Sequence, residues 1–131
     1  MHDAYAKAGR PDLLLSSLRR WSFFLADGYD TFGENWGWGT PVHGWSSTPS
    51  RDLVQVILGV TPGAPGFATA RISPAYGHVA TMSGSVPTPF GAIHVEVDGE
   101  RVTVTTPVPA ILVRPDGSEV AIEAGAQGWS A

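Results

Sequence analysis

The sequence predicts an α+β fold, with helices in the first part of the chain and β-strands in the second. Before Thr61, apolar residues recur at the spacing of an amphipathic helix. After Thr61, proline and glycine separate short runs in which apolar and polar residues alternate, as in strands with one buried face. The junction, residues 59–66, contains two prolines. We therefore expect one region at 1–60 and a second at 61–131.

The first two helices are expected within residues 1–26. Residues 2–8 are rich in alanine and end at Gly9, a residue suited to the position after a helix C-terminus. Pro11 is typical of a first helical turn, and it precedes a helix predicted over 12–26. Its apolar residues fall on one stripe: Leu13, Leu14, Leu18, Trp21 and Leu25.

A third helix is expected over residues 50–58, after an irregular loop. Glycines and a proline argue against regular structure at 28–48. Ser50 is a candidate N-cap for the helix, and Gly59 follows its end. Three helices of this length leave part of their apolar surface uncovered, so we expect an exposed apolar face that needs a partner.

The second region is expected to form an antiparallel β-sandwich. Asp98-Gly99 and Asp116-Gly117 are typical hairpin turns between strands. Short strands at regular spacing, joined by such turns, favour two packed sheets. The predicted strands are 67–72, 79–86, 93–97, 102–106, 111–113 and 120–122.

Composition excludes several classes of function. The net charge is −4 and no basic stripe is present, which argues against nucleic acid as a partner. Without cysteine, disulfides and thiolate metal sites are absent, and the histidines lack metal-ligand spacing, so we expect no metal and no cofactor. No apolar run is long enough to span a membrane, and the first residues do not resemble a signal peptide. The compartment stays open.

The loop at 31–47 holds the residues with the clearest chemical meaning. It combines the carboxylate of Glu34 and the imidazole of His43 with three tryptophans, Trp36, Trp38 and Trp45. Aromatic faces stack on the C–H side of a pyranose, and a carboxylate moves protons, so this combination indicates a sugar-processing site. Glycoside hydrolysis normally takes two carboxylates, which makes the loop half of such a site.

Each residue also has a structural interpretation. Trp36 fits equally well as a core or interface anchor, and Trp38 fits such an anchor better than it fits a sugar contact. Asp27 and Asp30, which flank the loop, are better interpreted as turn-capping residues than as catalytic acids.

Short motifs follow one another along nearly the whole chain, and their ordered set is more specific than any one of them. They are residues 8–13 (AGRPDL), 31–36 (TFGENW), 43–47 (HGWSS), 57–62 (ILGVTP), 65–67 (PGF), 72–74 (ISP) and 84–91 (GSVPTPFG). In this order and at about this spacing, they resemble the C-terminal end of bacterial α-L-rhamnosidases of the inverting (α/α)6-barrel type.

The resemblance implies a role for each region. Residues 1–60 would be the last helices and the active-site loop of a six-hairpin barrel, truncated here, and residues 61–131 the C-terminal β-sandwich. Glu34 would be the general base, while His43, Trp45 and Trp36 would contact the sugar. The family's general acid lies upstream, on barrel residues that this chain lacks, so the isolated chain is expected to be inactive. Its partners would be a rhamnose-containing glycoside and the rest of the barrel.

One residue departs from the family pattern, and two other functions remain open. The residue before the glutamate is usually tryptophan, whereas here it is Gly33, which alters the expected wall of the pocket. The chain is alternatively a non-catalytic carbohydrate-binding or interaction module whose working part is the sandwich. It is also alternatively one subunit of a split glycosidase.

Overall fold

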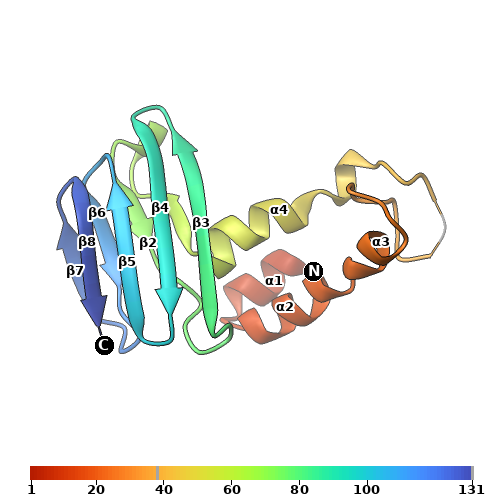
Figure 1. The fold of residues 1–131 in the computed structure, drawn as a ribbon, viewed down its shortest axis with the longest axis horizontal. Coiled ribbons are helices and arrows are strands. Elements are labelled where there is room, and N and C mark those ends of the chain that lie inside the picture. Colours follow the sequence, from red (N-terminus) through yellow and green to blue (C-terminus); the bar gives the residue numbers. More distant parts are fainter. Residues whose placement is uncertain (38, 131) are drawn as a thin grey trace. The chain divides into compact units, whose positions relative to one another are not determined.

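The computed structural model describes residues 1–37 and 39–130, and it confirms the α+β class (Figure 1). The chain forms two compact units, Met1–Leu53 and Val54–Ala131. The division falls within the third predicted helical segment, before the boundary expected near residue 60. The assignment of the first unit to a barrel stays a prediction. Among the described residues, no helix has the length and apolar character that crossing a membrane requires.

The first unit consists of short helices and one long loop. Among the described residues of this unit, no helix exceeds the nine residues of α2, so packing rather than intrinsic helix propensity must hold them. A π-helical turn, η2 (Leu53–Ile57), follows the last of them. The helices are α1 (His2–Lys7), α2 (Pro11–Arg19), α3 (Ser22–Ala26), the 3-10 turn η1 (Gly44–Ser46) and α4 (Thr48–Asp52).

The prediction of one continuous helix over 12–26 is wrong, because the structure has two helices, α2 and α3, in this range. It is broken at Arg20 and Trp21, whose amides bond to the carbonyls of Ser17 and Leu18 at 3.2 and 3.0 Å. These bonds span three residues instead of four and tighten the end of α2. The break turns the Trp21 ring into a cluster of aromatic side chains from the loop.

The predicted apolar stripe and N-cap also need correction. Leu14 and Leu18 are buried, as expected, but Leu13 and Leu25 are exposed. Ser50 lies inside α4 instead of capping it, because the helix begins at Thr48 with Pro49 in its first turn. Exposed leucines on the first unit agree with the expected apolar face.

A polar network around the buried carboxylate of Asp52 ties α1, α2 and α4 together. The His2 ring lies between Asp52 and Ser17: its Nδ1 is 2.6 Å from Asp52 Oδ2 and its Nε2 is 2.9 Å from Ser17 Oγ. Arg51 donates to the other carboxylate oxygen of Asp52 at 3.1 and 2.9 Å and also bonds to Asp3. Asp52 is only 1% exposed, so these contacts replace its hydration.

The second unit is a β-sandwich of two four-stranded sheets, with strand orders β1-β2-β6-β7 and β3-β4-β5-β8. The predicted sandwich is therefore confirmed. A 3-10 turn, η3 (Pro65–Phe67), separates the first two strands. The strands are β1 (Val60–Pro62), β2 (Ala70–Ile72), β3 (Thr81–Thr88), β4 (Gly91–Asp98), β5 (Arg101–Thr106), β6 (Ala110–Val113), β7 (Glu119–Ile122) and β8 (Gly125–Ser130).

Pairing follows the predicted hairpins, with one exception. β4 and β5 pair in antiparallel register with Asp98 opposite Arg101, and Gly99 between them has a φ of +57°. β6 and β7 form the second predicted hairpin, with Val113 opposite Glu119. The fully antiparallel prediction is wrong for β2 and β6, which pair in parallel. β1 and β8 were not predicted, because one is very short and the other lacks regular alternation.

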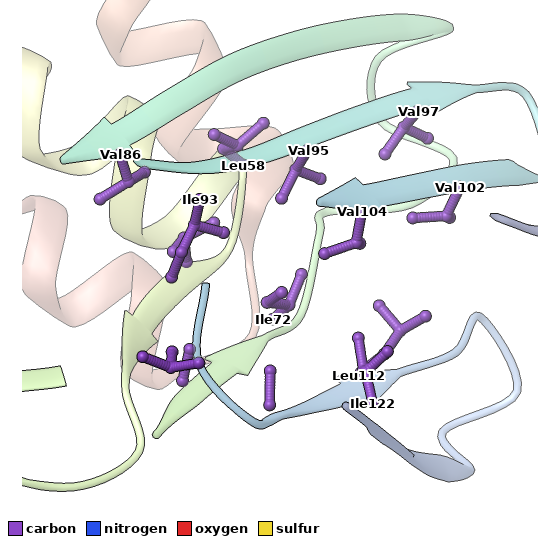
Figure 2. Close-up of a cluster of buried hydrophobic side chains, with 14 residues drawn as sticks. Leu58, Ile72, Val86, Ile93, Val95, Val97, Val102, Val104, Leu112 and Ile122 are labelled. Atoms are coloured by element: carbon purple, nitrogen blue, oxygen red, sulfur yellow. The ribbon is translucent and has the colours of Figure 1, made fainter. Parts of the chain in front are cut away.

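The core lies between the two sheets (Figure 2). Alternation sends every second side chain of β4 and β5 inward, and those of β2, β6 and β7 meet them from the facing sheet. On β3, Gly84 has no side chain where Leu58 packs: a Cβ there would lie 2.9 Å from Leu58 Cδ2. The largest fully buried apolar residues of the sandwich are Val60, Ile72, Ile93, Val95, Val97, Val104, Leu112 and Ile122.

Ionisation of Tyr76 is expected to lower the stability of the sandwich at alkaline pH. Its hydroxyl donates to the Val113 carbonyl at 2.9 Å, and burial raises the pKa of the Tyr76 phenol to about 12. Because this pKa exceeds the unfolded value, the contribution to stability is complete below pH 10 and is lost as pH rises towards 12. We expect Tyr76→Phe to lower stability slightly at pH 8, by about 1 kcal/mol, and to reduce the further loss between pH 8 and 11.

Urea denaturation of the chain at the two pH values measures this effect. Tyr29→Phe, at an exposed tyrosine, is the matched control and should lose as much stability on alkalinisation as the unmodified chain. An equal alkaline loss with and without the Tyr76 hydroxyl would contradict the prediction.

Candidate functional site

The loop that carries the candidate site residues folds back on itself. The Glu34 amide donates to the Thr40 carbonyl at 3.0 Å, and the His43 amide donates to the Phe32 carbonyl at 2.7 Å. The Thr31 hydroxyl donates to the Pro41 carbonyl at 2.8 Å. These bonds hold residues 31–34 beside residues 40–43, so two parts of the loop that are separate in the sequence share one surface.

The side chain of Glu34 is held from inside the loop. The Thr40 amide donates to Glu34 Oε2 at 3.2 Å, and the Ser46 hydroxyl donates to the Glu34 carbonyl at 3.3 Å. The Glu34 side chain can lie against the backbone of Gly39 only because this residue has no side chain, since a Cβ there would lie 2.7 Å from both Cβ and Oε2 of Glu34. Glu34 itself is exposed, which leaves its carboxylate open to a substrate or water.

Gly33, the departure from the family pattern, has a steric explanation. This residue is buried, and a Cβ on it would lie 2.1 Å from Cε1 and 2.2 Å from Cζ of Phe24. The ring of Phe24, from α3, occupies the space that a side chain at position 33 needs. A tryptophan at this position would therefore require Phe24 to move, and the aromatic wall next to Glu34 comes from α3 instead.

His43 and Trp45 lie next to each other at the start of η1. Their ring centroids are 6.0 Å apart with an interplanar angle of 74°. The His43 Nδ1 is 3.0 Å from the Thr40 hydroxyl oxygen, which links the imidazole to the residue that holds Glu34. Trp45 is 92% exposed, an unusual state for an indole, so its face is free to receive a ligand.

Trp36 lies in a different environment. Its ring is 5.6 Å from that of Trp21, and the Arg20 guanidinium carbon lies 3.6 Å from its centroid, a cation–π contact. Its Nε1 is buried and has no hydrogen-bond partner in the described part of the chain. These contacts make Trp36 an anchor of the loop, and a sugar contact by this residue stays a prediction. Trp38 lies outside the described residues.

A depression of about 320 Å³ lies beside Glu34, formed by α3 and the loop. Asp27, the residue after α3, lines it together with Glu34. Two carboxylates therefore border one depression, although the sequence favoured a turn-capping role for Asp27. His43 and Trp45 do not line it. The remaining lining residues are Phe23, Phe24, Tyr29, Asn35, Gly37, Gly39, Thr40 and Pro41.

A second depression on this unit is almost entirely apolar. It measures about 390 Å³ and is bordered by α2, α3 and the start of the loop, with Leu18, Trp21 and Phe32 in its wall. Leu25 and Leu53, at its margins, are exposed. Within residues 1–37 and 39–130, no group of three or more histidine and acidic side chains is arranged to hold a metal ion.

Known proteins resemble this chain in sequence and in fold. The α-L-rhamnosidase of Alteromonas sp. (strain LOR) is 34% identical to it, in a match that spans 80% of this chain and 14% of that protein. The crystal structure of the GH78 family rhamnosidase of Bacillus sp. GL1 matches with a TM-score of 0.64 and 27% identity, over 94% of this chain and 15% of that one. No family model matches the chain.

The chain thus spans 14% and 15% of the length of the two proteins that it matches. The agreement of sequence and fold over most of this chain confirms the resemblance suggested by its motifs. The chain is related in sequence and in fold to one part of the α-L-rhamnosidases.

Proposed function

We propose that this chain forms part of an enzyme that removes terminal α-L-rhamnosyl residues with inversion, and that it supplies the general base, Glu34. Residues 1–60 would belong to the catalytic barrel and residues 61–131 to the sandwich that follows it. The observation that carries the proposal is the hydrogen-bonded loop that joins Glu34, through Thr40, to His43 and the exposed Trp45. The relation to α-L-rhamnosidases supports a rhamnoside as the proposed substrate of this loop.

In this reaction Glu34 would take a proton from a water molecule that attacks the anomeric carbon opposite the leaving group. A second carboxylic acid would protonate the glycosidic oxygen, at roughly 6.5–9.5 Å from the first carboxylate, which leaves room for the water. That acid would come from the rest of the barrel. Trp45 would stack on the apolar side of the sugar, and His43 would bind one of its hydroxyl groups.

The apolar depression supports a partner of this kind. Leu25 and Leu53, which line the depression, are exposed, and a contiguous apolar surface is often covered in a functional assembly. Further barrel helices would cover it, either from the same polypeptide or from a second one.

Two assays on an aryl α-L-rhamnoside test the proposal. The isolated chain should show no turnover above background, because the proposal takes the general acid from the rest of the barrel. A chimera in which the chain replaces the matching part of the Alteromonas rhamnosidase should recover turnover. Turnover by the isolated chain at the rate of an ordinary glycosidase would contradict the half-site proposal and direct attention to Asp27. An inactive but folded chimera would contradict the assignment of the base.

A further inference from the structure

Thr40 contacts both residues to which the proposed function assigns chemistry. Its amide donates to Glu34 Oε2 at 3.2 Å, and its carbonyl accepts the Glu34 amide at 3.0 Å. Its hydroxyl oxygen lies 3.0 Å from His43 Nδ1. The carboxylate and the imidazole are thus oriented by one short residue between them, and nothing in the motif pattern drew attention to it.

We propose that Thr40 is a positioning residue that fixes the orientation of the Glu34 carboxylate and the tautomer of His43. The inference rests on the proposed function, because it gives these two orientations their purpose. Thr40 does not touch the sugar in this scheme. It acts through its two neighbours.

In this proposal the Thr40 hydroxyl selects the tautomer of His43. A neutral imidazole carries one proton, and the hydrogen bond at one ring nitrogen determines which nitrogen holds it. The contact itself fits either direction, because a hydroxyl both donates and accepts. The proposal takes the Thr40 hydroxyl as the donor to Nδ1, which places the proton on Nε2 and gives His43 an N–H donor on the side away from Thr40. An N–H donor suits a hydroxyl oxygen of the sugar. The opposite tautomer would present a lone pair there instead.

The Thr40 amide fixes the orientation of the Glu34 carboxylate. By holding Oε2, the Thr40 N–H leaves Oε1 of Glu34 as the oxygen available to a water molecule. The absence of a Cβ at Gly39 is part of the same arrangement, since that atom would lie 2.7 Å from Oε2. Because the carboxylate bond uses the backbone amide, a side-chain substitution at Thr40 removes the imidazole contact without removing the donor to Glu34.

The pair Thr40→Val and Thr40→Ser separates the hydroxyl from the shape of the side chain. Nitrogen-15 correlation spectra of the imidazole rings in the 131-residue chain, recorded at a pH where histidine is neutral, report each tautomer directly. The unmodified chain and Thr40→Ser should show His43 in the Nε2–H form, and Thr40→Val should show a mixture of forms. A His43 spectrum that is unchanged in Thr40→Val would overturn the proposal.

His94 is an internal control. Its Nδ1 lies 2.6 Å from the Ser85 hydroxyl oxygen in the sandwich, so its spectrum should change in Ser85→Ala and stay constant in the Thr40 variants. If the spectra of both histidines change in Thr40→Val, the variant has unfolded as a whole. Backbone spectra of the variant and the unmodified chain show whether this has happened. Thr40→Ser, which retains the hydroxyl, must restore the His43 signal even if Thr40→Val loosens the loop.

Kinetics in the chimera connect the tautomer to function. Thr40→Val should raise KM by up to about 10-fold, the loss expected for one hydrogen bond, with a smaller effect on kcat, and Thr40→Ser should restore it. If the tautomer shifts but KM does not, the positioning role is wrong. If Glu34→Gln leaves turnover intact, the proposed function fails, while the spectra still decide whether Thr40 orients His43.

Discussion

Replacing Glu34 by glutamine in the chimera is expected to lower kcat by about 10²–10⁴ and to change KM little. Glutamine keeps the shape of the side chain and accepts the Thr40 amide through its carbonyl oxygen, but it cannot take a proton from water. The interaction removed acts mainly in the transition state, which places the loss in kcat. Steady-state kinetics on an aryl α-L-rhamnoside measure it.

Controls distinguish a lost base from a damaged site. Glu96→Gln, at an exposed position on β4, should leave both constants unchanged. His43→Ala and Trp45→Ala should raise KM more visibly, because both are proposed to bind the sugar. Azide should restore turnover to the Glu34→Gln enzyme by attacking directly, and it should yield a glycosyl azide of inverted configuration. Near-normal turnover without azide would show that another group is the base.

Replacing Asp52 by alanine is expected to have the largest effect on stability. The carboxylate is 1% exposed and accepts bonds from His2 and Arg51. Its removal leaves the partly buried His2 ring and the half-exposed Arg51 guanidinium without their acidic partner, and breaking a pair at a buried carboxylate in this way costs up to about 3–5 kcal/mol. The loss should appear in the unfolding of the first unit, followed in urea by tryptophan fluorescence, to which Trp21 and Trp36 of this unit contribute.

Asp3→Asn provides the matched control from the same network. Asp3 also bonds to Arg51 but is exposed, so its replacement should change stability little. If Asp52→Ala were as mild as Asp3→Asn, the network would contribute little to holding α1, α2 and α4 together.

The sequence was most informative where structure is local. Asp98-Gly99 predicted the β4–β5 hairpin because a tight turn depends on the residues in it. The parallel pairing of β2 with β6 depends instead on residues about forty positions apart, and no local pattern encodes it. The break after α2 was missed for the same reason, since Trp21 packs on Phe32 and Trp36 from the distant loop.

In the candidate site, too, local sequence identified single residues, whereas their arrangement depends on residues distant in the sequence. Motifs selected Glu34, His43 and Trp45, but their relation to Thr40 depends on how the loop folds back, which spacing does not reveal. Asp27 was interpreted as a turn residue because its neighbours in the sequence suggest nothing else. Its place beside Glu34 follows from the path of the chain between α3 and the loop. The departure at Gly33 likewise depends on a residue distant in the sequence, because the Phe24 ring fills the space that a side chain there would need.

The network around Asp52 shows that hydrogen-bond geometry alone does not identify an active site. Asp52, His2 and Ser17 are joined in the order carboxylate, imidazole, hydroxyl, as in the triad of serine hydrolases. A search for active sites by interatomic distances would select them. Ser17, however, is only 7% exposed, and a nucleophile must reach its electrophile. The same three groups that activate a serine at a surface hold helices together when no substrate can reach them.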